Sequence, residues 1–408
     1  MSRFTSVKGI KIENVFFAFL IICNYTTYVL VSEAGFYSSA VLYHAVPDPE
    51  NSFENFIILT VLYFILFCFI GIIPSKERER EYSKKRLNII DCIFTIIILY
   101  NWSIFVFMGL GGAGTTNTSV GFLVNILPIT PLMLIYYSSR NGDYNKHFYI
   151  NLITGVLLPL AQGWSGILVS IFIIYILSKL KYVTKDNALK LAASFVLTLL
   201  AYKYIYSLKF FLRSGESVDV DFIIAAEYAI SRVTAFQNFD FFVSITDQMS
   251  LYFSDSPLFY VREFLLALVP KFIFGLSNYQ PIDNLFTVDF LASGDPDFDN
   301  SGFAITLPGL YFLAVAVNYL NIIVFPLFIV AVFFLIKRLA FFIWSEKIKY
   351  YLVYVYLSIF YSGNMRELAI QIYVLFLYVV ITRICLYKTT PKERLQNLAA
   401  GHCETMTA

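Results

Sequence analysis

The sequence predicts an all-α polytopic membrane protein with about ten transmembrane helices and one large loop outside the membrane. Of its 408 residues, 58% are hydrophobic and 14% are charged, whereas a soluble domain has about 25% charged residues. Apolar runs close to the roughly 20 residues that a membrane-crossing helix needs recur along the chain. Lysine and arginine collect in every second connection between these runs, as they do in the cytoplasmic loops of membrane proteins.

Ten apolar runs are long enough, or nearly long enough, to cross a membrane. They are 15–32, 56–73, 88–108, 119–138, 147–161, 164–180, 188–207, 318–336, 349–362 and 366–386. The fifth and sixth are short and meet at Ala161–Gly163, so we expect a hairpin there. The first run also resembles a signal peptide, but the nine runs after it favour an uncleaved first helix.

The basic residues orient these runs. The connection 74–87 carries six lysines and arginines, and the connection 179–190 carries four lysines. The alternate connections 33–55, 109–118 and 161–163 carry none. We therefore expect both termini in the cytoplasm.

One long polar segment divides the chain. An N-terminal membrane region of seven helices covers 1–207, and a large periplasmic loop with amphipathic helices covers 208–302. A C-terminal membrane region covers 303–387, and a cytoplasmic tail covers 388–408. The loop carries thirteen acidic residues against five basic ones. We expect this acid-rich loop to fold over a membrane-embedded cavity on the outer side.

Two apolar stretches in or beside the loop are predicted not to cross the membrane. Residues 257–276 contain Arg262, Glu263 and Lys271, and a charge at mid-membrane costs roughly 2.5–3.5 kcal/mol. An amphipathic helix at the outer interface avoids that cost. Residues 303–317 are expected to form a dipping or surface helix, because a second crossing there would move the next basic cluster outside.

Several classes of protein are excluded by what the chain lacks. The three histidines, His44, His147 and His402, lie outside the long loop, and no zinc-protease, P-loop or dinucleotide-binding motif occurs. We therefore expect no metal and no cofactor, and no nucleic-acid partner. The predicted spans have almost no ionisable residue at mid-depth, where coupled transporters keep one.

Four basic residues on or near the outer face are candidates to bind an anionic, lipid-linked substrate. They are Arg232, Arg262, Lys271 and Arg366. A guanidinium fits phosphate oxygens bidentately, and near a low-dielectric membrane face it would stabilise a departing diphosphate. The alternative for each is a pair with a loop acid or a lipid headgroup. Arg366 is the most constrained, because it lies in SGNMRELAI between two predicted spans.

The chain resembles the O-antigen (oligosaccharide repeat-unit) polymerase family of the Wzy type. The shared features are many spans, cytoplasmic ends and one dominant outer loop late in the chain. Locally, AISRVTAF around Arg232, LVPKFIFGLSNYQP at 268–281 and SGFAITLPGLYF at 301–312 are similar to family segments. The chain departs from the family at Lys271, where arginine is common, at Gln280, which replaces a lysine before proline, and at Leu310, where an acid is frequent.

The resemblance implies a GT-C-like membrane glycosyltransferase that acts as a polysaccharide polymerase in the bacterial inner membrane. It would move a growing glycan from undecaprenyl diphosphate onto the terminal sugar of an incoming lipid-linked repeat unit, without a metal. Arg232, Arg262, Lys271 and Arg366 would hold the diphosphates. Arg232 would also belong to the catalytic set, with Glu263 or Glu227 as the base for the acceptor hydroxyl. Implied partners are the undecaprenyl-diphosphate-linked glycans, membrane lipid, a flippase and a chain-length regulator.

Three other activities stay open. The related O-antigen ligases rely on an outer-loop histidine, and this loop has none. A metal-dependent glycosyltransferase would use an acidic pair in the first outer loop, for which Asp48 and Glu50 are candidates, although proline-flanked acids usually form a solvated turn. A flippase or exporter of lipid-linked oligosaccharide would share the membrane setting, but the long loop and the uncharged spans disfavour it.

Overall fold

The structure is a computed structural model that describes most of the chain. It describes residues 10–35, 49–71, 84–111, 122–140, 142, 144–164, 166–180, 182–214, 221–222, 234–268, 281–291, 304–343, 345 and 347–387. Three candidate site residues, Glu227, Arg232 and Lys271, lie outside these ranges, as does the whole predicted tail 388–408.

Nearly all the regular structure in these ranges is helical. The N-terminal membrane region contains α1 (Ile12–Ala34), α2 (Pro49–Gly71), α3 (Lys84–Met108), α4 (Phe122–Ile126), α5 (Ile129–Ser138), α6 (Lys146–Ala161), α7 (Gly166–Lys179) and α8 (Lys185–Ser214). The loop region contains α10 (Phe236–Ser244), α11 (Thr246–Tyr252), α12 (Phe259–Leu268), α13 (Ile282–Leu285) and the π-helical η2 (Phe286–Leu291). The C-terminal region contains α14 (Leu307–Val317), α15 (Asn321–Ala340), α16 (Lys347–Ser362) and α17 (Met365–Tyr387). Two short strands, β1 (Ile10–Lys11) and β2 (Tyr182–Val183), pair antiparallel.

Each apolar run that the sequence predicts coincides with helix. The run 119–138 is divided into α4 and α5 because Pro128, which lacks a backbone N–H, stands at their junction. The stretch 303–317 forms α14, a helix separate from α15. The amphipathic stretch 257–276 forms α12 over Phe259–Leu268. Helix α8 continues past residue 207, so the regular structure reaches seven residues into the segment that we assigned to the outer loop.

Five helices in the described part of the chain are each long and apolar enough to cross a membrane. They are Ile12–Ala34, Asn51–Gly71, Leu87–Met108, Asn321–Ala340 and Met365–Arg383. Only 22% to 50% of the most apolar window of each is buried inside the structure, so much of their apolar surface faces outward, as contact with lipid requires. The chain is therefore an all-α polytopic membrane protein, and the full count of ten spans stays a prediction.

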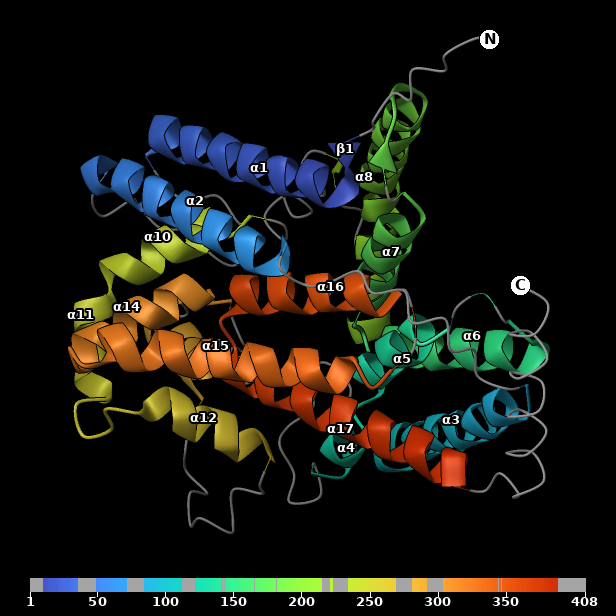
Figure 1. The fold of residues 1–408 in the computed structure, drawn as a ribbon. Helices are drawn as coiled ribbons and strands as arrows, with labels where there is room; N and C mark the ends of the chain where they lie inside the picture. The colour runs from blue at the N-terminus through green and yellow to red at the C-terminus, as the bar shows by residue number, and fades with distance from the viewer. Residues whose placement is uncertain are drawn as a thin grey trace, which may run out of the picture.

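The helices form a bundle with a cap at one end (Figure 1). Helices α15, α16 and α17 pack together, and α1 packs on α2 beside them. Helices α10, α11, α12 and α14 gather at one end of this group, on the left of Figure 1. Helices α7 and α8 run across the direction of α1, α2 and α16. Helices α1, α2, α15, α16 and α17 therefore run in roughly the same direction.

Helix α16 joins two ends of the bundle, which we name after the residues found there. The Lys347 end lies where α16 begins, and the Arg366 end lies where α16 turns into α17. At the Lys347 end, β1 pairs with β2, and Lys349 Nζ lies 2.8 Å from Glu13 Oε1 of α1. At the Arg366 end, the backbone N–H of Ile305 donates to the carbonyl of Ser362 at 3.1 Å. Each of these contacts joins segments that the charge pattern places on the same side of the membrane.

Candidate functional site

The turn between α16 and α17 fixes the position of Arg366. Gly363 has φ +64°, a left-handed conformation that glycine adopts without a steric penalty. The side chain of Asn364 then caps α17, because its Oδ1 accepts from the backbone N–H of Arg366 at 2.9 Å and of Glu367 at 3.2 Å. An asparagine in this position satisfies amides that a helix start leaves without intrahelical partners. Arg366 is thus placed in the first turn of α17.

Arg366 is held by a carboxylate from the loop region. Its Nη2 donates to both oxygens of Asp283 in α13, at 2.6 and 2.7 Å. Asn364 Nδ2 also donates to Asp283 Oδ2, at 3.1 Å. A carboxylate that accepts charge-assisted bonds from a guanidinium is among the stronger pairings available to proteins. The loop helix α13 is therefore fastened to the α16–α17 turn.

A second carboxylate stands beside this pair. Glu263 Oε2 of α12 lies 3.9 Å from Arg366 Nε. Glu263 Oε1 accepts from the backbone N–H of Ile282 at 2.9 Å, at the start of α13. Glu263 is only 3% exposed, while the Arg366 side chain is 33% exposed. The guanidinium thus has a face toward solvent and two acids behind it.

A third acid widens the cluster toward α16. Ser362 Oγ donates to Glu367 Oε2 at 2.9 Å, and Glu367 follows Arg366 directly in α17. We call Glu263, Asp283, Arg366 and Glu367 the outer polar cluster, after the side of the membrane on which the sequence predicts Arg366. Three carboxylates stand against one guanidinium in it, so the cluster contains groups that can accept a proton beside a single cation. Within the described residues, no group of three or more His, Cys, Asp or Glu side chains is arranged to hold a metal ion.

The start of α14 lies against the α16–α17 turn, and its backbone is strained at Thr306. Thr306 has φ +63°, which is unusual for a β-branched residue, and it is fully buried. Its Oγ1 caps α14 by accepting from the backbone N–H of Gly309 at 3.0 Å. A Cβ added at Gly363 would lie 2.4 Å from the Thr306 carbonyl, so only glycine fits at that position. Backbone strain of this kind persists where the surrounding structure holds it, and it concentrates at functional sites.

The loop helix α10 is fixed to α1 and α2 near the same end. Asp240 is 3% exposed, and it accepts from Ser52 Oγ at 2.7 Å and from Asn55 Nδ2 at 2.6 Å. At the start of α10, Asn24 Oδ1 of α1 accepts from the backbone N–H groups of Ala235 and Phe236, both at 3.0 Å. The loop region is thus joined to the bundle by buried polar contacts on both sides of the cap.

Of the six predicted site residues, Glu263 and Arg366 are brought together, with 3.9 Å between their side chains. Arg262 Nη1 donates to Ser256 Oγ at 3.1 Å, within the loop region. Glu227, Arg232 and Lys271 lie outside the described residues, so their placement stays a prediction. For Arg366, the alternative that the sequence left open, a pair with a loop acid, is the arrangement found. Of the acidic pair in the first outer loop, Asp48 also lies outside the described residues.

The sequence did not single out Asp283, Asn364 or Thr306 as site residues. Asp283 was one of thirteen loop acids, and the signal that distinguishes it is its place two residues after Pro281, where a helix begins. Asn364 lies between Gly363 and Met365, the first residue of α17, which is a typical helix-capping position. Thr306 stands two residues before Pro308. A proline in the first turn indicates where a helix begins, and Thr306 directly precedes the first residue of α14.

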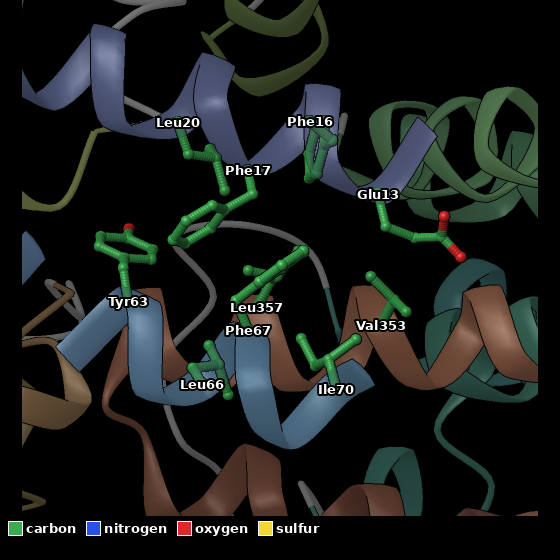
Figure 2. A pocket seen from close by; sticks show the side chains of 10 residues that line it. All are labelled: Glu13, Phe16, Phe17, Leu20, Tyr63, Leu66, Phe67, Ile70, Val353 and Leu357. Atoms are coloured by element: carbon green, nitrogen blue, oxygen red, sulfur yellow. The ribbon is translucent and has the colours of Figure 1, made fainter. Parts of the chain in front are cut away.

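An apolar crevice lies between α1, α2 and α16, away from the outer polar cluster (Figure 2). Phe17 of α1 faces Phe67 of α2 there, with ring centroids 4.5 Å apart. Leu357 of α16 completes this part of the lining. Glu13 stands at one side, where it pairs with Lys349. This lining suits hydrocarbon and not a sugar, so the crevice is no candidate for the glycan.

Comparison with known proteins finds no match for this chain: no protein-family model, no curated protein and no solved structure. A functional assignment therefore depends on the residues and their geometry.

Proposed function

We propose that the chain is a membrane glycosyltransferase that polymerises undecaprenyl-diphosphate-linked oligosaccharide repeat units into O-antigen or a similar surface polysaccharide. The observation that carries this proposal is the group of Glu263, Asp283 and Arg366 at the capped end of the bundle. Transfer of a glycan from a lipid diphosphate needs a base and a cation close together at a membrane surface. The outer polar cluster has both.

The proposed setting is the outer face of a bacterial inner membrane. In the ten-span topology, the basic connections lie in the cytoplasm, and α1, α15 and α17 then place the Arg366 end outside. Loop helices α10 to α13 would cover the cluster from the periplasmic side. Both termini would be cytoplasmic, and the helices that face lipid would bring the undecaprenyl chains to the cluster.

The chemistry assigns separate roles to the members of the cluster. The acceptor hydroxyl oxygen bonds to the anomeric carbon of the donor, and the bond from that carbon to the diphosphate oxygen breaks. Undecaprenyl diphosphate leaves with the electron pair, and the hydroxyl proton passes to a carboxylate. Asp283 accepts bonds from Arg366 and Asn364, and we assign the role of base to Glu263, whose Oε2 lies 3.9 Å from Arg366 Nε. The exposed face of Arg366 suits the departing diphosphate.

The other predicted residues complete this proposal. Arg232, Arg262 and Lys271 would bind the second diphosphate, since donor and acceptor both carry one, and Glu227 is the alternative base. These roles come from the resemblance to O-antigen polymerases. The same resemblance implies partners, namely a flippase that delivers the repeat units and a regulator of chain length.

The test is polymer formation in a strain that lacks the chromosomal copy and carries wild-type or variant protein. We expect the wild type to restore a ladder of polymer lengths, and Arg366→Lys to leave single repeat units on the surface lipid, because lysine lacks the planar fork. Arg383→Lys is the matched control at the other end of α17 and should keep the ladder. Equal ladders from both variants would remove Arg366 from the site.

The same strain separates the alternatives. Loss of a polymerase leaves single repeat units on the surface, whereas loss of a flippase or exporter leaves little or no glycan outside. Loss of a ligase would leave polymer attached to its lipid carrier. Purified protein in vesicles with a lipid-linked repeat unit should release undecaprenyl diphosphate in the presence of a chelator. Loss of this release with chelator would indicate a metal-dependent glycosyltransferase.

A further inference from the structure

The Lys347 end holds a group of cations that the proposed glycosyl transfer does not use. Lys347, the first residue of α16, donates through Nζ to the hydroxyl of Tyr144. Its Nζ also lies 4.5 Å from the ring centroid of Tyr137 and 4.9 Å from that of Tyr144. The ammonium is therefore placed against two aromatic faces, between the α5–α6 connection and α16, and is half-buried.

A second lysine acts on the same point. Lys179, the last residue of α7, is close enough to perturb both Lys347 and Tyr144 electrostatically. Burial, and then Lys179, lower the pKa of Lys347 to about 8. Two like charges repel each other, and the half-buried Lys347 also loses hydration. An anion between them would remove both penalties.

The neighbouring carboxylate is not available to these lysines. Asp91 accepts from Tyr136 at 2.6 Å and from Asn145 at 2.7 Å, and it forms a buried ion pair with Arg140. The Nε and Nη1 atoms of Arg140 are buried and have no hydrogen-bond partner. Arg140 also acts electrostatically on Tyr144. Among the described residues, Asp91 therefore neutralises Arg140, and Lys179 and Lys347 form no ion pair. Positive charge is in excess in this region.

We infer that Lys179, Lys347 and Tyr144 form a binding site for the phosphodiester headgroup of an anionic phospholipid. The location supports a lipid headgroup, because the three residues lie at helix ends on the side that the charge pattern places in the cytoplasm. Basic pockets between membrane helices on that side suit anionic headgroups. Lysine supplies point charges and tyrosine a hydroxyl donor, which together match the oxygens of one phosphodiester.

The inference depends on the membrane setting and not on glycosyl transfer. A polymerase, a flippase or a ligase would each retain this site. Loss of headgroup binding without loss of polymer would thus leave the proposed function intact, and loss of polymer in Arg366→Lys would leave this site intact.

The test measures binding of phosphatidylglycerol to the full chain in detergent, with phosphatidylcholine as the neutral probe. We expect wild type to prefer phosphatidylglycerol, and Lys179→Gln to weaken that binding about five-fold, since a lysine near anionic lipid is worth roughly this factor. The Lys179→Gln/Lys347→Gln double variant should lose about 25-fold, by the same factor for each lysine. Lys190→Gln, an exposed lysine in α8, is the matched control and should bind as wild type does.

Two further arms decide the source of the phosphate and guard against misfolding. Inorganic phosphate at millimolar concentration should not displace phosphatidylglycerol; complete displacement would indicate a free-phosphate site and overturn the lipid assignment. Lys347→Arg keeps the charge and should retain most of the binding. Lys179 is exposed, so its variant tests the site even if a substitution at Lys347 impairs folding. Equal binding of both lipids by wild type, or unchanged binding in Lys179→Gln, would overturn the inference.

Discussion

The two ends of α16 carry opposite balances of charge. At the Arg366 end, one guanidinium is bonded by Asp283 and approached by Glu263, so acids are in excess. At the Lys347 end, Lys347 donates to the Tyr144 hydroxyl and Lys179 acts electrostatically on both, so cations are in excess there. The same sorting is visible in the sequence as basic connections on one side and an acid-rich loop on the other.

The difference separates what each end can do. In the outer polar cluster, the carboxylates and the guanidinium contact one another and hold three segments together. Such a group can exchange one partner for a substrate while the others keep their positions. At the opposite end, Lys349 pairs with Glu13, whereas Lys347 and Lys179 form no ion pair within the described residues. The first end therefore suits chemistry, and the second suits attachment.

The largest expected effect is on transfer, from Glu263→Gln. Replacing the carboxylate with an amide keeps the shape of the side chain and removes the base. We therefore expect polymer formation to fall about 100-fold or more. Asp247→Asn, an exposed acid of α11, is the matched control in the same loop region. Rates of undecaprenyl diphosphate release from vesicles provide the measurement. A normal rate in Glu263→Gln would transfer the role of base to Glu227 or another acid.

The next effect is on stability alone, at the Lys347 end. Arg140→Met leaves Asp91 charged and buried without its ion pair, and breaking a buried pair costs about 3–5 kcal/mol. We expect a lower midpoint of thermal unfolding in detergent, while transfer per folded molecule stays unchanged. Adding Asp91→Asn to Arg140→Met should recover part of the loss. If Arg140→Met also abolished transfer in folded protein, the two ends would not be functionally separate.

A smaller effect is predicted for Gly363→Ala at the Arg366 end. Alanine would need a left-handed backbone and would meet the Thr306 carbonyl, and we expect a loss of about 2–4 kcal/mol from strain and displacement together. Gly166→Ala is the control, because a Cβ there meets nothing within 4 Å. Thermal unfolding should separate the two variants clearly. Equal midpoints would show that the contact between α14 and the α16–α17 turn is readily rearranged.

The helices were predictable from sequence because each depends on its own composition. Apolar runs and proline positions, such as Pro128 between α4 and α5, act within a few residues. The end of α8 at Ser214, beyond the predicted residue 207, was not predictable from the length of its apolar run. A helix can continue into water beyond its apolar part. Arg366 and Glu263 were predictable as charges outside the hydrocarbon, because a charge inside it is costly, while their placement on the outer side stays a prediction.

Their partners were not predictable, because the contacts join distant parts of the chain. Asp283 and Arg366 are 83 positions apart, and no local pattern distinguishes Asp283 from the other loop acids. The sequence left open whether Arg366 binds an acid or a phosphate. The pair between Arg366 and Asp283 depends on where α13 lies relative to the α16–α17 turn, and therefore on how the whole cap packs; phosphate binding by Arg366 stays a prediction. The strained Thr306 is likewise a consequence of its contact with Gly363.

The smallest expected effect is a pH dependence at the Lys347 end. Lys347 lies outside the predicted span, and its pKa falls from an ordinary 10.5 to about 8 in the folded protein. The unfolded chain thus binds more protons between these values, so stability should rise as the pH increases from about 8 to 10.5. Lys179 acts electrostatically on Lys347, and burial raises the pKa of the Tyr144 hydroxyl above its ordinary value.

Thermal unfolding of wild type and Lys347→Gln, measured from pH 7 to 10.5 in a zwitterionic detergent, would show this as a rise that the variant lacks. Phosphatidylglycerol should have the opposite effect on the slope. A bound headgroup favours the charged lysine, so it should raise stability most below pH 8 and lose that influence as Lys347 deprotonates. Lys190→Gln should follow wild type both with and without phosphatidylglycerol. Parallel curves for wild type and Lys347→Gln would mean that Lys347 titrates as an ordinary surface lysine, and the contrast between the two ends would then rest on the outer polar cluster alone.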